Sequence, residues 1–165
     1  MKVSIIIRTY NEARHLAALL EGIRSQNAPD FATEVIVVDS GSTDRTLSIA
    51  QGFECRIEHI RREDFSFGRS LNLGCQCASG DVLVMVSGHC IPINENWLNN
   101  LVTPLIDDKL ALVYGRQVGD ESSHFSECRI FDKYYPDISR LPQEGFFCNN
   151  ANSAMRRSIW LQRAC

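Results

Sequence analysis

The sequence has no apolar run long enough to cross a membrane. A spanning helix needs about 18 to 20 consecutive apolar residues, and no stretch approaches that length. Met1 also leads directly into a strand-like run, without the apolar segment and cleavage site of a secretion signal. We therefore expect no transmembrane segment and a cytoplasmic protein, and we leave open whether it docks on the inner face of the membrane.

An excess of positive charge is missing as well. Lys and Arg number 17 against 20 Asp and Glu, for a net charge of −3. This balance leaves nothing to neutralise a nucleic-acid backbone, so we expect a small ligand and no nucleic-acid partner. No repeat, low-complexity tract or linker divides the 165 residues, which predicts one domain over residues 1–165.

The seven cysteines include no CxxC pair, and reduced thiols are expected. Cys75, Cys77, His89 and Cys90 are one conceivable zinc cluster. A CxC and an adjacent His-Cys lack the usual spacing of zinc ligands, so we favour thiols packed in the core.

Short apolar runs alternate with amphipathic segments along the chain. Strands are predicted at residues 3–7, 34–39, 55–60, 81–86 and 110–115, and helices at 11–26, from a cap at Ser42 or Thr43 to 50, at 69–78 and at 95–105. Beyond Gly119 we expect a mobile loop with a short helix, then a short strand, an Asn-rich turn and a terminal helix. The alternation predicts an α/β fold with a mostly parallel sheet, and ligands beyond the carboxyl ends of its strands.

Polar residues follow the first two predicted strands at that edge. The Asp39 carboxylate could accept hydrogen bonds from a base or ribose while Gly41 lets the backbone approach the ligand, or Asp39 could simply turn the strand into a helix cap. Thr9 and Tyr10 are placed to line a base pocket. Glu12 is either a ligand contact or a residue at a helix start, and the two readings are equally supported.

Arg69 and Asn72 lie three residues apart on a predicted helix, and hence on one face. A guanidinium and an amide there could contact a base or a diphosphate. The alternatives are a solvated arginine and an asparagine bonded to nearby backbone.

Three motifs, VSIIIRTYNEARHL, VIVVDSGSTDRT and GRSLNLGCQCASGDVLVMVSGHCIP, occur in an order that resembles the family 2 glycosyltransferases. The resemblance implies a GT-A fold, a Rossmann-like three-layer αβα sandwich. It implies transfer of a hexosyl or deoxyhexosyl group from a nucleoside-diphosphate-sugar to a hydroxyl of a sugar or lipid-linked acceptor, with inversion, in polysaccharide or glycoconjugate synthesis. It also puts Thr9, Tyr10 and Asp39 at the nucleotide.

The chain departs from the family pattern in several places. Arg8 replaces a frequent proline, Ser40 replaces a second acidic residue, and Ser87-Gly88-His89 stands where the family usually carries Asp-x-Asp. Ser87 and Gly88 are still expected at the nucleotide. His89 could ligate Mn²⁺ or Mg²⁺, or could be a half-buried histidine bonded to backbone, so the use of a divalent cation is left open.

The last part of the sequence resembles the family's segment near the transferred sugar or the acceptor. That resemblance assigns Asn149, Asn150 and Asn152 to this region, although a plain polar turn is an equal alternative. No acidic residue follows Glu144, so the general base is expected beyond Cys165, in a C-terminal part that is missing.

The alternative function is a nucleotide or nucleotide-sugar binding module without turnover. A sugar nucleotidyltransferase is disfavoured because IRTYNE is not a glycine-rich phosphate loop.

Overall fold

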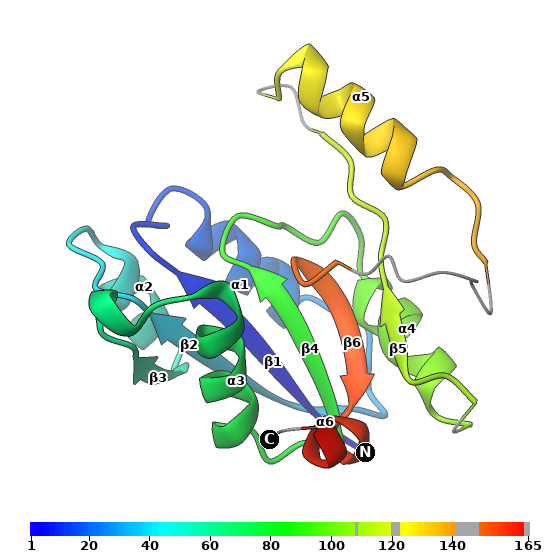
Figure 1. Ribbon diagram of the computed structural model, residues 1–165, viewed down its shortest axis with the longest axis horizontal. Helices are drawn as coiled ribbons and strands as arrows, with labels where there is room; N and C mark the ends of the chain where they lie inside the picture. The colour runs from blue at the N-terminus through cyan, green and yellow to red at the C-terminus, as the bar shows by residue number, and fades with distance from the viewer. Residues whose placement is uncertain (108, 120–122, 141–148, 164–165) are drawn as a thin grey trace.

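The computed structural model describes residues 1–107, 109–119, 123–140 and 149–163. Helices and strands alternate along the chain, as expected (Figure 1). In chain order they are β1 (Lys2–Thr9), α1 (Leu16–Arg24), β2 (Ala32–Asp39), α2 (Thr46–Gly52), β3 (Arg56–His59), η1 (Arg62–Asp64), α3 (Phe67–Cys77), β4 (Val82–Ser87), α4 (Trp97–Val102), η2 (Thr103–Leu105), β5 (Leu112–Tyr114), α5 (Phe125–Tyr134), β6 (Asn152–Arg156) and α6 (Arg157–Arg163).

The strands form one sheet in the order β3-β2-β1-β4-β6-β5. The first four of these neighbours pair in parallel, whereas β6 runs antiparallel to both β4 and β5. Strand β4 is buried along its whole length and β1 over most of it, which is why both are almost entirely apolar in sequence. The prediction of an α/β fold with a mostly parallel sheet is confirmed.

Helices cover both faces of this sheet. Alternate residues of β1 point to opposite faces, so that Ile5 and Ile7 pack with α1, α2 and α4, whereas Ile6 packs with α3. Figure 1 shows α3 on the near side of the sheet and α1 behind it. Helix α5 stands apart from these layers and contains no buried residue. No helix in the described part of the chain is long and apolar enough to traverse a bilayer.

Four of the cysteines, Cys55, Cys75, Cys77 and Cys90, pack as core thiols. Cys75 packs on the α3 side of the sheet, while Cys90 packs against the core on the other side. Burial raises the pKa of the Cys75 thiol to about 12, so the group stays protonated. Among the residues that the structure describes, no three His, Cys, Asp or Glu side chains gather as a metal site. Cys75 and Cys77 lie on the opposite face of the sheet from Cys90, so the residues of the zinc alternative are not brought together.

Several predicted helix starts are wrong, because local polar contacts decide them. Helix α1 begins at Leu16 and not at residue 11, since Asn11 has a left-handed φ of 55° and its side-chain amide accepts from the Thr43 N–H. Neither Ser42 nor Thr43 caps α2; the Asp44 carboxylate accepts from the Thr46 N–H instead.

The other side of the sheet shows similar departures. Helix α3 begins two residues before the expected start, because the Ser66 hydroxyl accepts from the Arg69 N–H. Helix 95–105 is two shorter pieces, α4 and η2, and the strand at 110–115 is only three residues long.

The C-terminal segment also differs from its prediction. Its strand, β6, begins at Asn152, which therefore belongs to the sheet and not to a turn. The strand expected around Phe146 and Phe147 lies outside the described residues. The short helix expected after Gly119 is α5.

The end of β2 is fastened to the end of β1 by the Asp39 carboxylate, which is completely buried. It accepts a hydrogen bond from the Thr9 hydroxyl at 3.0 Å, two from the N–H groups of Gly41 and Ser42 at 2.9 Å each, and one from the Ser42 hydroxyl. Gly41 can turn the chain here because its φ of 96° suits a residue without a side chain. A charged group is thereby satisfied inside the protein.

Further hydrogen bonds continue this fastening along the two loops that follow β1 and β2. The Asn11 N–H donates to the Ser42 hydroxyl, and the Glu12 N–H donates to the Thr46 hydroxyl, both at 2.8 Å. The Ala13 N–H donates to the Asp44 carboxylate at 3.0 Å. The loop after β1 is consequently held by the loop after β2, and this bonding positions the Glu12 side chain.

Replacing Gly74 by Ala should destabilise the protein by about 1–3 kcal/mol through overpacking. A Cβ at this position of α3 would overlap the Ile6 Cγ2 and lie 3.1 Å from the Val38 Cγ2. Gly68→Ala in the same helix is the matched control, because nothing lies within 4 Å of its Cβ position. Urea denaturation should show Gly68→Ala within about 1 kcal/mol of the parent. Equal effects of the two substitutions would contradict the close packing of α3 on the sheet.

Replacing Asp39 by Asn should cost about 1–3 kcal/mol of the free energy of unfolding, because the amide has an NH₂ group where hydrogen-bond donors already converge. Thermal and urea denaturation measure the loss. Asp30→Asn, an exposed carboxylate just before the opposite end of β2, serves as the control. An Asp39→Asn variant as stable as the control would show that the four hydrogen bonds do not fasten the two strands.

Candidate functional site

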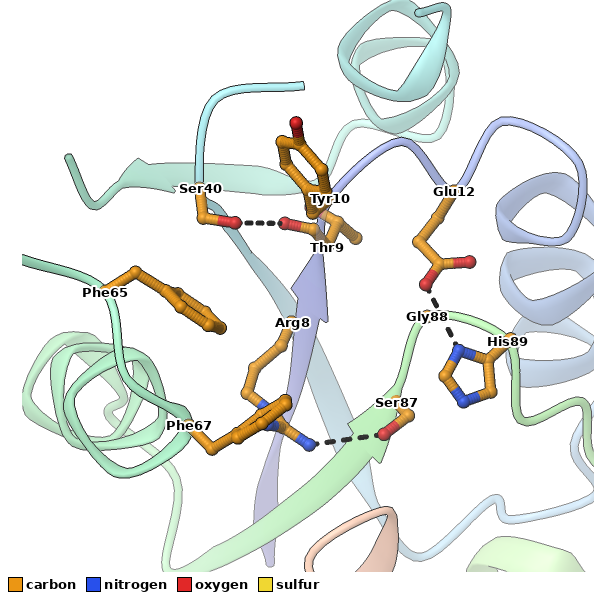
Figure 2. A pocket seen from close by; sticks show the side chains of 10 residues that line it. All are labelled: Arg8, Thr9, Tyr10, Glu12, Ser40, Phe65, Phe67, Ser87, Gly88 and His89. Carbon is orange, nitrogen blue, oxygen red and sulfur yellow. Dashed lines mark hydrogen bonds and ion pairs between the residues drawn. The ribbon is translucent and has the colours of Figure 1, made fainter. Parts of the chain in front are cut away.

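A hollow of about 110 Å³ opens at the carboxyl edge of the parallel strands. Parallel pairing brings its residues together, since Thr9 lies in register with Asp39 and Arg8 lies in register with Ser87. Figure 2 shows side chains from β1, β4 and the loops beyond them converging there. The lining residues are Arg8, Thr9, Tyr10, Glu12, Ser40, Phe65, Phe67, Ser87, Gly88 and His89.

One side of the hollow is formed by Glu12 and His89. The His89 Nδ1 lies 3.1 Å from a Glu12 carboxylate oxygen, and the imidazole is largely exposed (Figure 2). Gly88 permits this approach, because a Cβ there would lie 2.8 Å from the Glu12 Cγ. The Gly88 N–H donates to the Arg8 carbonyl at 3.2 Å, which holds the turn after β4 against β1. The sequence named these three positions separately; the fold makes them one unit.

The opposite side is aromatic. Phe65 and Phe67 form an edge-to-face pair with ring centroids 5.5 Å apart, and Phe67 is 69% exposed. Tyr10 is 46% exposed, and the Arg62 guanidinium lies 5.8 Å from its ring centroid. Exposed aromatic faces bind a nucleobase or the apolar face of a sugar by stacking. Of these three rings the sequence indicated only Tyr10, because the approach of the segment before α3 to the end of β1 is a tertiary contact.

Arg8 lies between these two sides, and its site role was not predicted from the sequence. Its Nη2 donates to the Ser87 hydroxyl at 3.2 Å, and its guanidinium carbon lies 4.9 Å from the Phe67 ring centroid (Figure 2). Burial lowers the pKa of Arg8 from its ordinary value, yet an arginine remains protonated in proteins. A positive charge therefore faces the hollow.

Ser40 closes the floor of the hollow at the end of β2. Its hydroxyl donates to the Thr9 carbonyl at 3.1 Å, and the residue is almost fully buried. In the sequence Ser40 was notable only as the replacement of an acidic residue. In the structure its hydroxyl bonds the end of β2 to the end of β1.

Four residues predicted at the nucleotide do not line the hollow. Asp39 is fully buried and accepts its four hydrogen bonds from the protein, and Gly41 forms the turn that follows β2. Arg69 and Asn72 lie exposed on α3; the Arg69 Nη1 donates to the Asp64 carbonyl, and the Asn72 side chain accepts from the Trp160 indole, both at 3.4 Å. Their contact with a nucleotide stays a prediction.

The three asparagines also lie outside the residues that line the hollow. Asn149 donates to the Tyr135 hydroxyl and accepts from the Ala151 N–H, while Asn150 is exposed. Asn152 is nearly buried in β6, where it accepts from the Trp97 indole at 2.8 Å and donates to the Arg116 carbonyl. Both ends of the Asn152 amide therefore have protein partners, and its assignment to a sugar or acceptor stays a prediction.

The side chains of this site fit a protein-held divalent cation poorly. Glu12 and His89 supply at most two ligands, and they contact one another. Mg²⁺ and Mn²⁺ prefer several oxygen ligands, usually carboxylates, and Ser87-Gly88-His89 contains none. The nearby guanidinium of Arg8 adds a charge of the same sign as the cation.

Comparison with known proteins gives this site its context. The sequence profile of the family "Glycosyl transferase family 2" matches residues 4–161. An O-antigen chain rhamnosyltransferase, RfbN, from Salmonella typhimurium is 29% identical over 97% of this chain and 54% of that protein. The glycosyltransferase AglE from Haloferax volcanii is 35% identical over 68% of this chain and 38% of that protein. The chain thus spans about half the length, or less, of these curated relatives.

Solved structures agree in fold. A mannosyltransferase from Pyrobaculum calidifontis, in complex with GDP-Man and Mn²⁺, matches 98% of this chain and 46% of that one, with a TM-score of 0.69 at 22% identity. TarS from S. aureus, in complex with UDP-GlcNAc, matches 99% of this chain and 48% of that one, with a TM-score of 0.70 at 19% identity. At these identities the likeness establishes the GT-A architecture alone.

The family profile covers nearly the whole sheet, from β1 to α6, and includes every residue that lines the hollow. With that match and the GT-A fold, this chain belongs to glycosyltransferase family 2.

Proposed function

We propose that this chain is the nucleotide-sugar-binding core of an enzyme that transfers a sugar from a nucleoside-diphosphate-sugar donor to an acceptor hydroxyl. The observation that carries the proposal is the hollow at the carboxyl edge of the sheet, where exposed aromatic rings face a positively charged side chain. In open parallel sheets, ligands bind beyond this edge. Family membership supports sugar transfer in glycan synthesis as the reaction class.

The donor would occupy the hollow only in part. Pockets that enclose a whole drug-sized ligand measure roughly 300–1,000 Å³, against about 110 Å³ here. Tyr10 and Thr9 suit the base, while Phe65 and Phe67 suit an apolar group such as the methyl of a deoxysugar. A deoxyhexosyl donor is thus our first choice and a hexosyl donor the second, and the rhamnosyltransferase relative supports that order.

The reaction itself is proposed to invert the anomeric centre in one displacement. The acceptor oxygen forms a bond to the anomeric carbon, the bond to the diphosphate breaks, and a general base takes the hydroxyl proton. We assign this base to no residue of the hollow, because the only carboxylate there, Glu12, contacts His89. The acceptor is proposed to be a sugar or a lipid-linked sugar, as in polysaccharide or glycoconjugate synthesis.

The proposed compartment is the reducing cytoplasm. Five cysteines lie in the described part of the chain, and all five are free thiols. Disulfides persist in oxidising compartments, so free thiols accord with a cytoplasmic protein.

A binding module without turnover is the second candidate. The observation that favours it is the replacement of the family's carboxylate pair by Ser87-Gly88-His89. Such a module would bind the nucleotide as tightly as an enzyme does but would leave the donor intact. Release of nucleoside diphosphate from a donor by the full-length protein, measured with and without sugar acceptors, separates the two candidates.

Calorimetry against uridine, thymidine and guanosine diphosphates should reveal one preferred nucleotide. Tyr10→Ala should weaken it by about 1–3 kcal/mol, the usual value of one base stacked on an aromatic ring. Tyr134→Ala is the matched control, because Tyr134 is also 46% exposed but lies on α5, away from the hollow. Absence of binding by all three nucleotides would refute the proposed function, and an unaffected Tyr10→Ala variant would refute the base position.

Divalent cations should contribute little to nucleotide affinity. With at most Glu12 and His89 as protein ligands, added Mn²⁺ or Mg²⁺ should change the dissociation constant by no more than about threefold relative to chelator. His89→Ala should abolish whatever gain is measured, while His59→Ala, at an exposed position of β3, should not. Strong dependence that survives His89→Ala would place the ion on other ligands.

A further inference from the structure

The guanidinium of Arg8 has hydrogen-bonding capacity that the protein does not use. Within the described residues it makes one side-chain hydrogen bond, to the Ser87 hydroxyl, and no ion pair. Its Nε is buried and lacks a partner. A guanidinium has five N–H donors in a planar fork, so most of them remain available to a ligand in the hollow.

An unpaired, half-buried charge is costly, because burial removes water from it. Among the described residues no carboxylate forms an ion pair with Arg8, and Glu12, which lines the same hollow, contacts His89 instead. The Phe67 ring, 4.9 Å from the guanidinium carbon, and the Ser87 hydroxyl hold the group in place. The guanidinium is therefore held in place near the carboxyl end of β1, where it can bind an anion that enters the hollow.

The position of this cation points to a particular anion. Arg8 lies beside Ser87, the first residue of the triplet that stands at the end of β4. The Arg62 guanidinium, 5.8 Å from the Tyr10 ring centroid, adds a second positive charge near the hollow. A planar guanidinium matches the oxygens of a phosphate in two parallel hydrogen bonds.

We propose that Arg8 binds the diphosphate of the nucleotide donor and supplies the positive charge that a divalent cation would otherwise provide there. The proposal rests on the proposed function. During transfer the electron pair of the broken bond stays on the departing diphosphate oxygen, and the guanidinium stabilises that charge without giving up a proton. The acceptor proton leaves separately, to a base that this step does not involve.

Arg8→Gln tests this role by removing the charge and keeping a hydrogen-bonding side chain. Calorimetry in chelator compares the preferred nucleoside diphosphate with the same nucleoside without phosphates. Arg8→Gln should weaken the diphosphate by about 10- to 100-fold, as expected for a lost charge-assisted contact, and leave the nucleoside unchanged. Arg8→Lys keeps the charge without the fork and should fall between Arg8→Gln and the parent.

Arg24→Gln is the matched control. Its guanidinium also lies over an aromatic ring, Phe53, at 5.6 Å, but on α1 and outside the hollow. It should leave both ligands unaffected, and circular dichroism confirms the folding of every variant. Since Arg8→Lys retains a positive charge beside the Phe67 ring, it keeps the test valid if Arg8→Gln folds poorly.

Three outcomes overturn the proposal, and they differ in what else they reject. Equal losses of diphosphate and nucleoside in Arg8→Gln would mean that Arg8 only shapes the hollow. Parent binding of diphosphate that disappears in chelator would assign the charge to a metal ion, and the proposed function would stand in both cases. Failure of the parent protein to bind any nucleotide would reject the proposed function together with this role.

Discussion

The burial of one carboxylate is the constraint on which the candidate site depends. Asp39 is fully enclosed, and a buried charge is tolerated only where donors surround it. Those donors come from the end of β1 and from the turn after β2, so satisfying the charge fixes both strand ends at once. The loop that carries Glu12 is then tied to the first residue of α2, Thr46. The residues that line the hollow on the β1 side are thus positioned by hydrogen bonds of Asp39 and Thr46, neither of which lines it.

The charged side chains at the hollow differ from those that the family pattern predicts at this edge of the sheet. Where two carboxylates would stand, the chain has a hydroxyl, a glycine and an imidazole, and one strand away it has a guanidinium. The two features are related through geometry, because parallel register puts Arg8 beside Ser87. A site that meets a diphosphate with a fixed cation needs no acidic residues at the end of β4. Gly88 then serves packing, since it admits the Glu12 side chain against the turn.

The sequence predicted the elements of the core well and the element ends poorly. β1 and β4 were recognisable because a strand covered on both faces is apolar throughout. The start of α1 was misplaced because Asn11 has helix-compatible neighbours but adopts a left-handed conformation, which a hydrogen bond to the next loop stabilises. Asn152 was taken for part of a turn because asparagine is common in turns, yet two long-range partners hold it within a strand.

Local sequence thus determined the layered α/β architecture, the edge of the sheet where the hollow lies, and the family, since periodicity and strand-end motifs are read over a few residues. Tertiary structure alone decided which of these residues meet. Phe65, Phe67 and Arg8 come together through the packing of the segment before α3 on β1, across more than fifty positions of chain. Asp39 and Asn152 instead have their polar groups satisfied inside the protein. Whether a polar side chain serves a ligand or the fold depends on which donors and acceptors surround it, and those arrive from distant segments.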